Sequence, residues 1–456
     1  MRHTATTQGL TAFLAAFALF SCSRSKPIEP VLEFKKESVL LDTLPQGLKP
    51  DDLQFSPDGT ESVYRWTTSE GRQGFAFNGR IEQYYDAVGD FVSYTRDGSH
   101  YAYTAKKDGK AFIVFDGTEG EPFDKLADPA LSVTGRSLAY AAKAGEDAFI
   151  VFNGRRLENK EYELIRPPDL SPDGGRVAYQ AKKQGRWLTV IDGKEGPAFD
   201  EVQEGYFSPD GRSFAYAGRR GSRWVFVRNG KVSREYDDVS VYPEAAAADL
   251  FTAREAGKEF CVFRGKEGLK YDKAGWPAVS PNGKKIAYDA ARGGESLVVL
   301  EKREGKPYDS VGRPVFSPDG KEIAYDAVEG RRFLMIRNDR ELADYNAMPG
   351  PAFSPVGGRL AYSAVNRDAS RHFVVEEGLK GKEYDDVGLL VWSRDGRHLA
   401  YRAREGDKEF LVVDGREGSP CDKVLSLVPR FSDDGKLVGA NVLKGREVWW
   451  VAEPTE

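Results

Sequence analysis

Short runs of alternating apolar and polar residues recur along this chain, each bounded by residues typical of tight turns. The clearest copy starts with the turn Ser-Pro-Asp-Gly at 208–211 and continues into the alternating run 212–216. A β-branched and aromatic run follows at 224–227, then Asn-Gly at 229–230, then Tyr-Asp-Asp-Val at 236–239. Alternation with a period of two over short runs predicts β-strands, not helices.

Both turn motifs have a physical basis. Proline presets φ at the second position of 208–211, and its glycine accepts the positive φ that completes a bulged hairpin. The Asn-Gly pair suits a two-residue hairpin, whose central positions both need φ > 0. We therefore expect four antiparallel strands per unit, with 224–227 as the third and the segment through 236–239 as the fourth. Such a thin sheet cannot bury both faces alone, so the units must stack around an axis as propeller blades.

The spacing of the first turn residue supports this interpretation. The turn recurs every 37 to 39 residues, apart from one gap of 72 that hides a degenerate copy, whose back half remains at 260–265 and 271–272. This period suits blades better than helical solenoids, and it predicts an all-β array of about eleven four-stranded blades. The turns begin at Ser56, Thr95, Ser132, Ser171, Ser208, Ser280, Ser317, Ser354, Ser393 and Ser432.

Eleven blades exceed the usual number in one ring, roughly four to eight. We therefore expect two propellers of five and six blades, over residues 37–240 and 241–456; one large closed ring is the alternative. Residues 37–42 look like a lone strand, and the last unit ends without a fourth strand, so the first strand is expected to complete the last blade. The one helix-favouring stretch, 243–250, lies where the degenerate turn should be.

The N-terminus predicts a location. An apolar run of about eleven residues at 10–20 is too short to span a bilayer and is typical of a secretory signal. It ends in Leu-Phe-Ser-Cys, which resembles the lipobox of bacterial lipoproteins. That resemblance implies a signal peptide at 1–21, a lipid on Cys22, and a tether over 22–36 in the bacterial envelope, at the outer membrane and facing the periplasm. An ordinary cleaved signal with an incidental cysteine is the alternative.

The repeated motif also carries a resemblance. Phe-Ser-Pro-Asp-Gly at 55–59, 207–211 and 316–320, each followed by Ala-Tyr or a near match, resembles the WD40-like PD40 repeat of TolB-type propellers. The motif departs from that pattern at 95–98, 133–135 and 355–357. The resemblance implies a propeller fold but no particular activity. TolB partnerships do not transfer, because no α/β domain stands between Cys22 and the first blade.

Several repeated or isolated residues invite a chemical role. The Tyr-Asp pairs, as at Tyr236 and Asp237, could form a ring of carboxylates that binds a cation; a structural role, with Asp capping backbone N–H groups and Tyr packing between blades, is favoured because nearly every blade has the pair. Cys261 and Cys421 replace apolar residues and are expected to be buried; a disulfide between them would need distant blades to touch. The other pairs are Tyr85-Asp86, Tyr308-Asp309 and Tyr384-Asp385, with Phe123-Asp124 and Phe199-Asp200 as variants.

Other chemistry is missing from the sequence. Besides His3 there are His100, His372 and His398, and the first and last of these three are expected beside turns in solvent, not as metal ligands. The sequence has no nucleophile elbow, zinc-binding motif or phosphate loop. The formal net charge of −5, with both signs mixed, speaks against a nucleic-acid surface.

These observations favour a non-enzymatic scaffold outside the cytoplasm, tethered to the membrane, that binds a protein, peptide or envelope polymer. No catalytic, cofactor-binding or metal-binding residue is predicted. The alternative is a metal-assisted hydrolase or lyase with its site in the central funnel, and a third possibility is a structural spacer.

Overall fold

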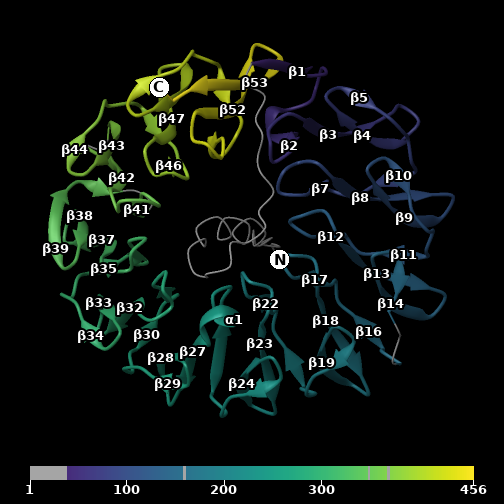
Figure 1. Cartoon of the computed structure of the whole chain (residues 1–456), viewed down its shortest axis with the longest axis horizontal. Helices are drawn as coiled ribbons and strands as arrows, with labels where there is room; N and C mark the ends of the chain where they lie inside the picture. The colour runs from purple at the N-terminus through teal and green to yellow at the C-terminus, as the bar shows by residue number, and fades with distance from the viewer. Residues whose placement is uncertain (1–37, 158–160, 348–349, 367–369, 456) are drawn as a thin grey trace, which may run out of the picture.

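A computed structural model describes residues 38–157, 161–347, 350–366 and 370–455. Within these ranges the chain forms eleven antiparallel sheets, one α-helix, α1 (Ala245–Ala248), and one 3-10 helix, η2 (Pro50–Asp52). The sheets follow one another in chain order around a common centre, so that the first, in purple, lies beside the last, in yellow (Figure 1). The predicted all-β propeller with about eleven blades is confirmed.

Two long strands, joined by a hairpin, form the middle of each sheet and supply most of its buried apolar side chains. The second strands of the sheets are β3 (Ser62–Thr67), β8 (Tyr101–Lys107), β13 (Leu138–Ala144), β18 (Val177–Lys183), β23 (Phe214–Arg220), β27 (Leu250–Glu255), β32 (Ile286–Arg292), β37 (Ile323–Glu329), β42 (Leu360–Val365), β47 (Leu399–Glu405) and β52 (Leu437–Lys444). The third strands are β4 (Gln73–Phe77), β9 (Lys110–Phe115), β14 (Asp147–Phe152), β19 (Arg186–Ile191), β24 (Arg223–Arg228), β28 (Lys258–Phe263), β33 (Glu295–Leu300), β38 (Arg332–Arg337), β43 (His372–Glu376), β48 (Lys408–Val413) and β53 (Glu447–Pro454).

Short fourth strands lie at the outer edge of the first ten sheets: β5 (Arg80–Ile81), β10 (Thr118–Glu119), β15 (Arg155–Arg156), β20 (Lys194–Glu195), β25 (Lys231–Val232), β29 (Lys266–Glu267), β34 (Arg303–Glu304), β39 (Arg340–Asp344), β44 (Leu379–Lys380) and β49 (Arg416–Glu417). Most of them have only two residues. They therefore leave little unpaired edge for another chain to join.

The first strand of nine sheets is split into two halves, both paired with the second strand. The second halves β7, β12, β17, β22, β41 and β46 lie toward the centre (Figure 1). The pairs of halves are β6 (Ala87–Val88) and β7 (Ser93–Tyr94), β11 (Lys125–Leu126) and β12 (Ala130–Leu131), β16 (Leu164–Ile165) and β17 (Asp169–Leu170), β21 (Glu201–Val202) and β22 (Tyr206–Phe207), β30 (Lys273–Ala274) and β31 (Ala278–Val279), β35 (Ser310–Val311) and β36 (Val315–Phe316), β40 (Asn346–Ala347) and β41 (Ala352–Phe353), β45 (Asp386–Val387) and β46 (Val391–Trp392), and β50 (Lys423–Val424) and β51 (Arg430–Phe431). The other two sheets begin with β2 (Gln54–Phe55) and β26 (Asp238–Val241).

We call the fully described segments between two halves the inner breaks. They lead the chain into the strand halves that lie nearest the centre. The inner breaks are residues 89–92, 127–129, 166–168, 203–205, 275–277, 312–314, 388–390 and 425–429.

The two predicted turns have the expected geometry. The Ser208 hydroxyl donates to Asp210 Oδ1 at 2.6 Å and accepts the Ser213 N–H at 2.9 Å, which fastens the hairpin from inside. Gly211 has φ of 69°, and Asn229 and Gly230 have φ of 48° and 78°. These positive values are why glycine and asparagine recur at these places.

The assignment of 236–239 to the fourth strand is wrong. β25 is the fourth strand of that sheet, and β26 pairs with β27 of the next one. Tyr236 makes one bridge to Trp224 of its own sheet, after which the Asp237 carboxylate accepts the Ala256 N–H of the next sheet at 2.7 Å. The chain therefore crosses between sheets at this pair, because the backbone of Tyr236 pairs with one blade and the side chain of Asp237 binds the next.

The same crossing recurs at other Tyr-Asp pairs, which agrees with the structural role favoured from the sequence. The Asp272 carboxylate accepts the Gly293 N–H at 2.8 Å, and the Tyr271 hydroxyl donates to Glu304 Oε1 of the following sheet at 2.8 Å. The pair therefore fastens one blade to the next.

The degenerate unit forms the sheet β26–β29 within the same circle, and α1 takes the place of its turn, as the helix-favouring stretch predicts. An apolar cluster that includes Phe226 and Phe251 joins this sheet to the preceding one, with the two rings stacked at 4.4 Å. The structure therefore does not show the expected division into propellers of five and six blades.

The last sheet takes its outer strand from the other end of the chain. β1 (Val39–Thr43) pairs antiparallel with β53, with Val39 opposite Trp450 and Thr43 opposite Glu447, and a bulge between Leu40 and Asp42. Leu41 is buried there together with Trp450.

Candidate functional site

The first and last sheets meet at what we call the seam. The Asn441 side chain of β52 donates to the Gly59 carbonyl at 2.8 Å, and Arg430 of β51 donates to the Ser56 carbonyl at 2.8 Å. Burial of the Arg430 guanidinium lowers its pKa to about 10. The last sheet therefore holds the first turn of the array by buried polar contacts as well as by packing.

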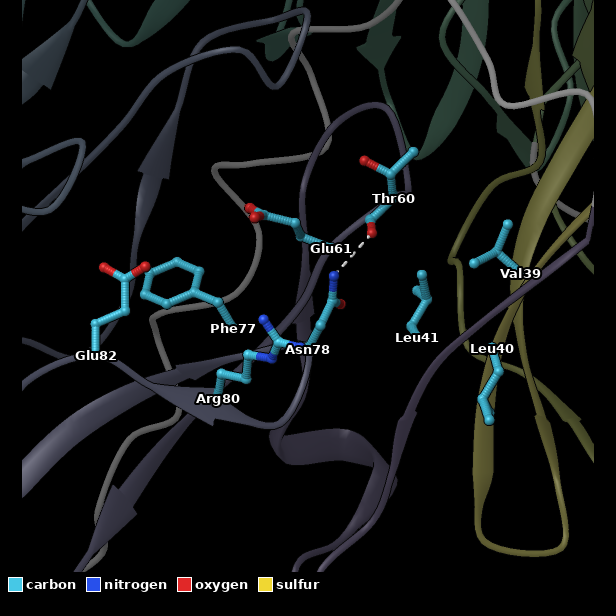
Figure 2. A pocket seen from close by; sticks show the side chains of 9 residues that line it. All are labelled: Val39, Leu40, Leu41, Thr60, Glu61, Phe77, Asn78, Arg80 and Glu82. Atoms are coloured by element: carbon cyan, nitrogen blue, oxygen red, sulfur yellow. Dashed lines mark hydrogen bonds between the residues drawn. The ribbon is translucent and has the colours of Figure 1, made fainter.

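A cavity of about 440 Å³ opens at the seam, beside the turn held in this way. β1 supplies an apolar wall, and the first sheet supplies a polar one (Figure 2). This volume lies in the range of small-molecule sites. The lining residues are Val39, Leu40, Leu41, Thr60, Glu61, Phe77, Asn78, Arg80 and Glu82.

Two carboxylates stand on the polar wall of this seam pocket. Glu61 accepts a hydrogen bond from the Tyr94 hydroxyl at 3.0 Å. Burial raises the pKa of Glu61, the Tyr94 hydroxyl opposes this, and the negative charges of Asp58 and Glu82 raise it further. The negative charge of Glu82 therefore acts on Glu61 along this wall.

Arg80 and Glu82 lie on the outer side of the pocket. Neither side chain makes an ion pair or a hydrogen bond with any residue that the structure describes. Asn78 between the walls is held fast, because it donates to the Thr60 carbonyl at 3.2 Å and accepts the Ser62 N–H at 2.8 Å (Figure 2). The pocket thus combines a rigid floor with one cationic and one anionic side chain that are free to bind a ligand.

Asp42 lies behind the apolar wall, in β1. Its Oδ1 accepts the Thr43 N–H at 2.6 Å, and its buried Oδ2 has no hydrogen-bond partner among the described residues. Burial raises the pKa of Asp42, and burial together with the Asp42 charge raises the pKa of Tyr64 to about 12. At neutral pH the Asp42 carboxylate therefore lowers the stability of the folded seam.

A second group of polar side chains joins three neighbouring sheets near the centre. Arg313 of an inner break donates to Glu244 Oε1 at 2.7 Å, and the Trp276 indole N–H donates to Glu244 Oε2 at 3.2 Å. The Arg313 guanidinium lies 4.9 Å from the centroid of the Trp276 ring, whose plane also stacks on Tyr242 at 5.0 Å. We call these four residues the three-sheet cluster.

In the three-sheet cluster, some N–H groups of Arg313 remain available as hydrogen-bond donors. Glu244 is buried, whereas the Arg313 side chain is 39% exposed and binds Glu244 and the Pro277 carbonyl through a single terminal nitrogen. Its other N–H groups make no hydrogen bond within the described part of the chain. The guanidinium is therefore oriented by Glu244 and Trp276 and can donate to a carboxylate or carbonyl of a bound molecule.

The residues singled out in the sequence occupy other places. Cys22 lies outside the described residues. Cys261 and Cys421 are buried and free, as expected, and burial raises the pKa of both thiols. His100 and His398 each place Nδ1 within hydrogen-bond distance of a turn carboxylate, Asp116 at 2.6 Å and Asp414 at 2.7 Å, and His398 is more covered than predicted.

Two further observations concern the described residues alone. No group of three or more His, Cys, Asp or Glu side chains is placed there to hold a metal ion. No described helix has the length and apolar character needed to cross a bilayer.

Sequence reasoning missed both the seam pocket and the three-sheet cluster. A weak signal exists for the first: after the Asp-Gly turns at 192–193 and 414–415 the chain continues with a basic residue, Glu and Gly, whereas after the Asn-Gly turn at 78–79 Ile81 takes the place of Glu and Glu82 that of Gly. The second has a signal in the inner breaks, where residue types differ between blades. Repeats direct attention to what recurs, whereas these residues depart from the repeat.

Comparisons with known proteins assign no family. No family model matches the chain, and no curated protein matches it. A crystal structure of a eukaryotic initiation factor is similar at 9% identity with a TM-score of 0.36, over 86% of this chain and 96% of that one. A prolyl endopeptidase structure is similar at 13% identity with a TM-score of 0.27, over 62% of this chain and 55% of that one. At these values the similarities carry no argument about function.

Proposed function

We propose that this protein is a non-enzymatic binding scaffold of the bacterial envelope, built as one closed eleven-bladed ring of PD40-type repeats. It is tethered by a lipid on Cys22 at the outer membrane, faces the periplasm, and binds a protein, peptide or envelope polymer through its inner breaks.

One observation carries the binding role. Turns and Tyr-Asp pairs repeat from blade to blade because they hold the fold together, whereas the inner breaks vary in length and in most residues, apart from a proline that ends several of them. They expose apolar side chains, with Leu427 65% exposed and Phe91 also exposed, and they present the oriented Arg313. Side chains that the repeat does not require, placed near the centre on rigid sheets, are suited to binding a partner.

Site-specific photocrosslinking tests this role. A benzoylphenylalanine placed at Phe91 or Leu427 should crosslink to the same partner in intact cells, identified by mass spectrometry. The matched control is Leu379, which is 78% exposed but lies on the outer strand β44. Equal labelling from all three positions, or none from the two inner ones, would contradict a binding site at the inner breaks.

The tether rests on the Leu-Phe-Ser-Cys motif and is tested separately. Labelled palmitate should be incorporated into the wild-type protein and not into a Cys22→Ala variant, and the variant should leave the membrane fraction. Labelling that survives this substitution would exclude Cys22 as the anchor.

A further inference from the structure

We infer that the seam pocket binds a basic amino acid, free or at a peptide end: a molecule with two cationic groups, one carboxylate and an aliphatic stem. This site is separate from the inner breaks, and no part of the argument depends on the proposed partner of the scaffold.

The charges of the pocket define the class of ligand. Glu61 and Glu82 supply two carboxylates and Arg80 one guanidinium, so the lining is net negative. Arg80 and Glu82 are two residues apart after the hairpin, which places extended-chain side chains on the same face about 7 Å from each other. They form no ion pair with each other, so both remain available to a ligand with the opposite arrangement of charges.

A lysine- or arginine-like molecule matches this arrangement. Its carboxylate would take the two parallel N–H bonds that Arg80 offers, and one cationic group would lie against Glu82. The second cationic group would lie near Glu61, where it would relieve the repulsion between the two carboxylates. A simple dicarboxylate is disfavoured because it would add negative charge to two unneutralised glutamates.

The apolar wall accounts for the stem. Val39 and Leu41 of β1 lie on one side of the pocket, opposite Asn78 of the first sheet, and the Phe77 ring points away from β1 (Figure 2). A chain of three or four methylene groups gains about 0.8 kcal/mol for each group that it buries. Because this wall belongs to the last sheet and the charges belong to the first, a bound ligand would also hold the two sheets together. Binding should therefore raise thermal stability.

Calorimetry and thermal unfolding of the full chain test the inference, with L-lysine, the dipeptide Gly-Lys, 1,5-diaminopentane and norleucine as ligands. L-lysine should bind with a Kd on the order of 1 mM or tighter and raise the melting temperature, and norleucine, which lacks the second amine, should bind at least tenfold more weakly. Comparable binding of Gly-Lys would identify a peptide end as the source, and binding of L-lysine alone would identify the free amino acid.

Two exposed side chains give informative variants. Glu82→Gln should weaken L-lysine and 1,5-diaminopentane alike by about tenfold, since it removes one charge-assisted bond. Arg80→Gln should weaken L-lysine but not 1,5-diaminopentane, which has no carboxylate. The control, Glu295→Gln, changes an exposed glutamate in a different sheet, β33, and should have no effect. Absence of saturable L-lysine binding to the wild-type chain, or L-lysine binding by the Arg80 and Glu82 variants that equals that of the wild type, would overturn the inference.

Discussion

The indole of Trp450 packs against the backbone of Gly59 so closely that no space remains for a Cβ atom on this glycine. Trp450 is fully buried in β53, at the end of the chain, and Gly59 completes the first turn, with φ of 78°. Nearly four hundred residues of chain separate them. This contact makes the stability of the first blade depend on the last one.

Gly59→Ala should therefore destabilise the protein strongly. A Cβ here meets the buried ring and also strains a left-handed backbone, at a combined cost of about 2–4 kcal/mol in the free energy of unfolding. The control Gly71→Ala has a similar φ of 82° with nothing near the added atom, so it should cost only about 1 kcal/mol. Urea unfolding measures both. Equal losses would show that backbone strain alone matters.

Neighbouring leucines of β1 test how much its packing at the seam contributes. Leu41 is buried against Trp450, and Leu40 is 44% exposed. Leu41→Ala should lower the free energy of unfolding by about 2–4 kcal/mol, whereas Leu40→Ala should change it by less than about 1 kcal/mol. Thermal and denaturant unfolding would reveal the difference. A mild effect of Leu41→Ala would mean that β1 is dispensable to the last sheet.

Two aspartates only four residues apart should respond to pH with opposite sign. Asp169 keeps contact with solvent, but desolvation by the protein around it and the nearby Glu204 raise its pKa from 3.8 to about 7, whereas the Ser171 hydroxyl and the Gly175 N–H lower the pKa of Asp173. Because folded Asp169 binds its proton more tightly than the unfolded chain does, its contribution to stability falls as pH rises from about 4 to 7. The contribution of Asp173 is present above about pH 4 and is lost as the pH falls below that value.

Asp169→Asn should therefore stabilise the protein at pH 8 relative to the wild type and have little effect at pH 4. Asp173→Asn should destabilise it at pH 8, with the difference vanishing in acid. Melting temperatures measured from pH 2 to pH 8 would show the two trends. Parallel pH profiles for both variants would contradict the assignment of opposite environments.

Two buried tyrosines separate the value of an interblade hydrogen bond from that of a buried ring. The Tyr271 hydroxyl donates to Glu304, whereas the Tyr325 hydroxyl has no hydrogen-bond partner among the described residues. Tyr271→Phe should cost about 1 kcal/mol in the free energy of unfolding. Tyr325→Phe should be neutral or slightly stabilising, because it removes an unsatisfied polar group. Urea titrations of the two variants would decide, and a larger loss for Tyr325→Phe would refute this account.

The repeat made much of the fold predictable, since its signals are local. Turn chemistry at 208–211 and at Asn229-Gly230 depends on φ preferences within a few residues, and the helix α1 depends on a short run of alanines. The wrong strand assignment at 236–239 arose because the same local signals do not show which sheet a segment joins. Whether this segment joins the sheet before it or the sheet after it depends on hydrogen bonds of Tyr236 and Asp237 to two different blades.

The sequence alone determined the blade, its turns and the number of copies, because these follow from backbone preferences that each short segment carries within itself. Only the tertiary structure decided that the units share one centre, that β1 lies beside β53, and which side chains meet at the seam and in the three-sheet cluster. Those contacts join residues tens to hundreds of positions apart. They depend on the small rotation from each blade to the next, summed over the whole array, and no local pattern of residues reports that sum.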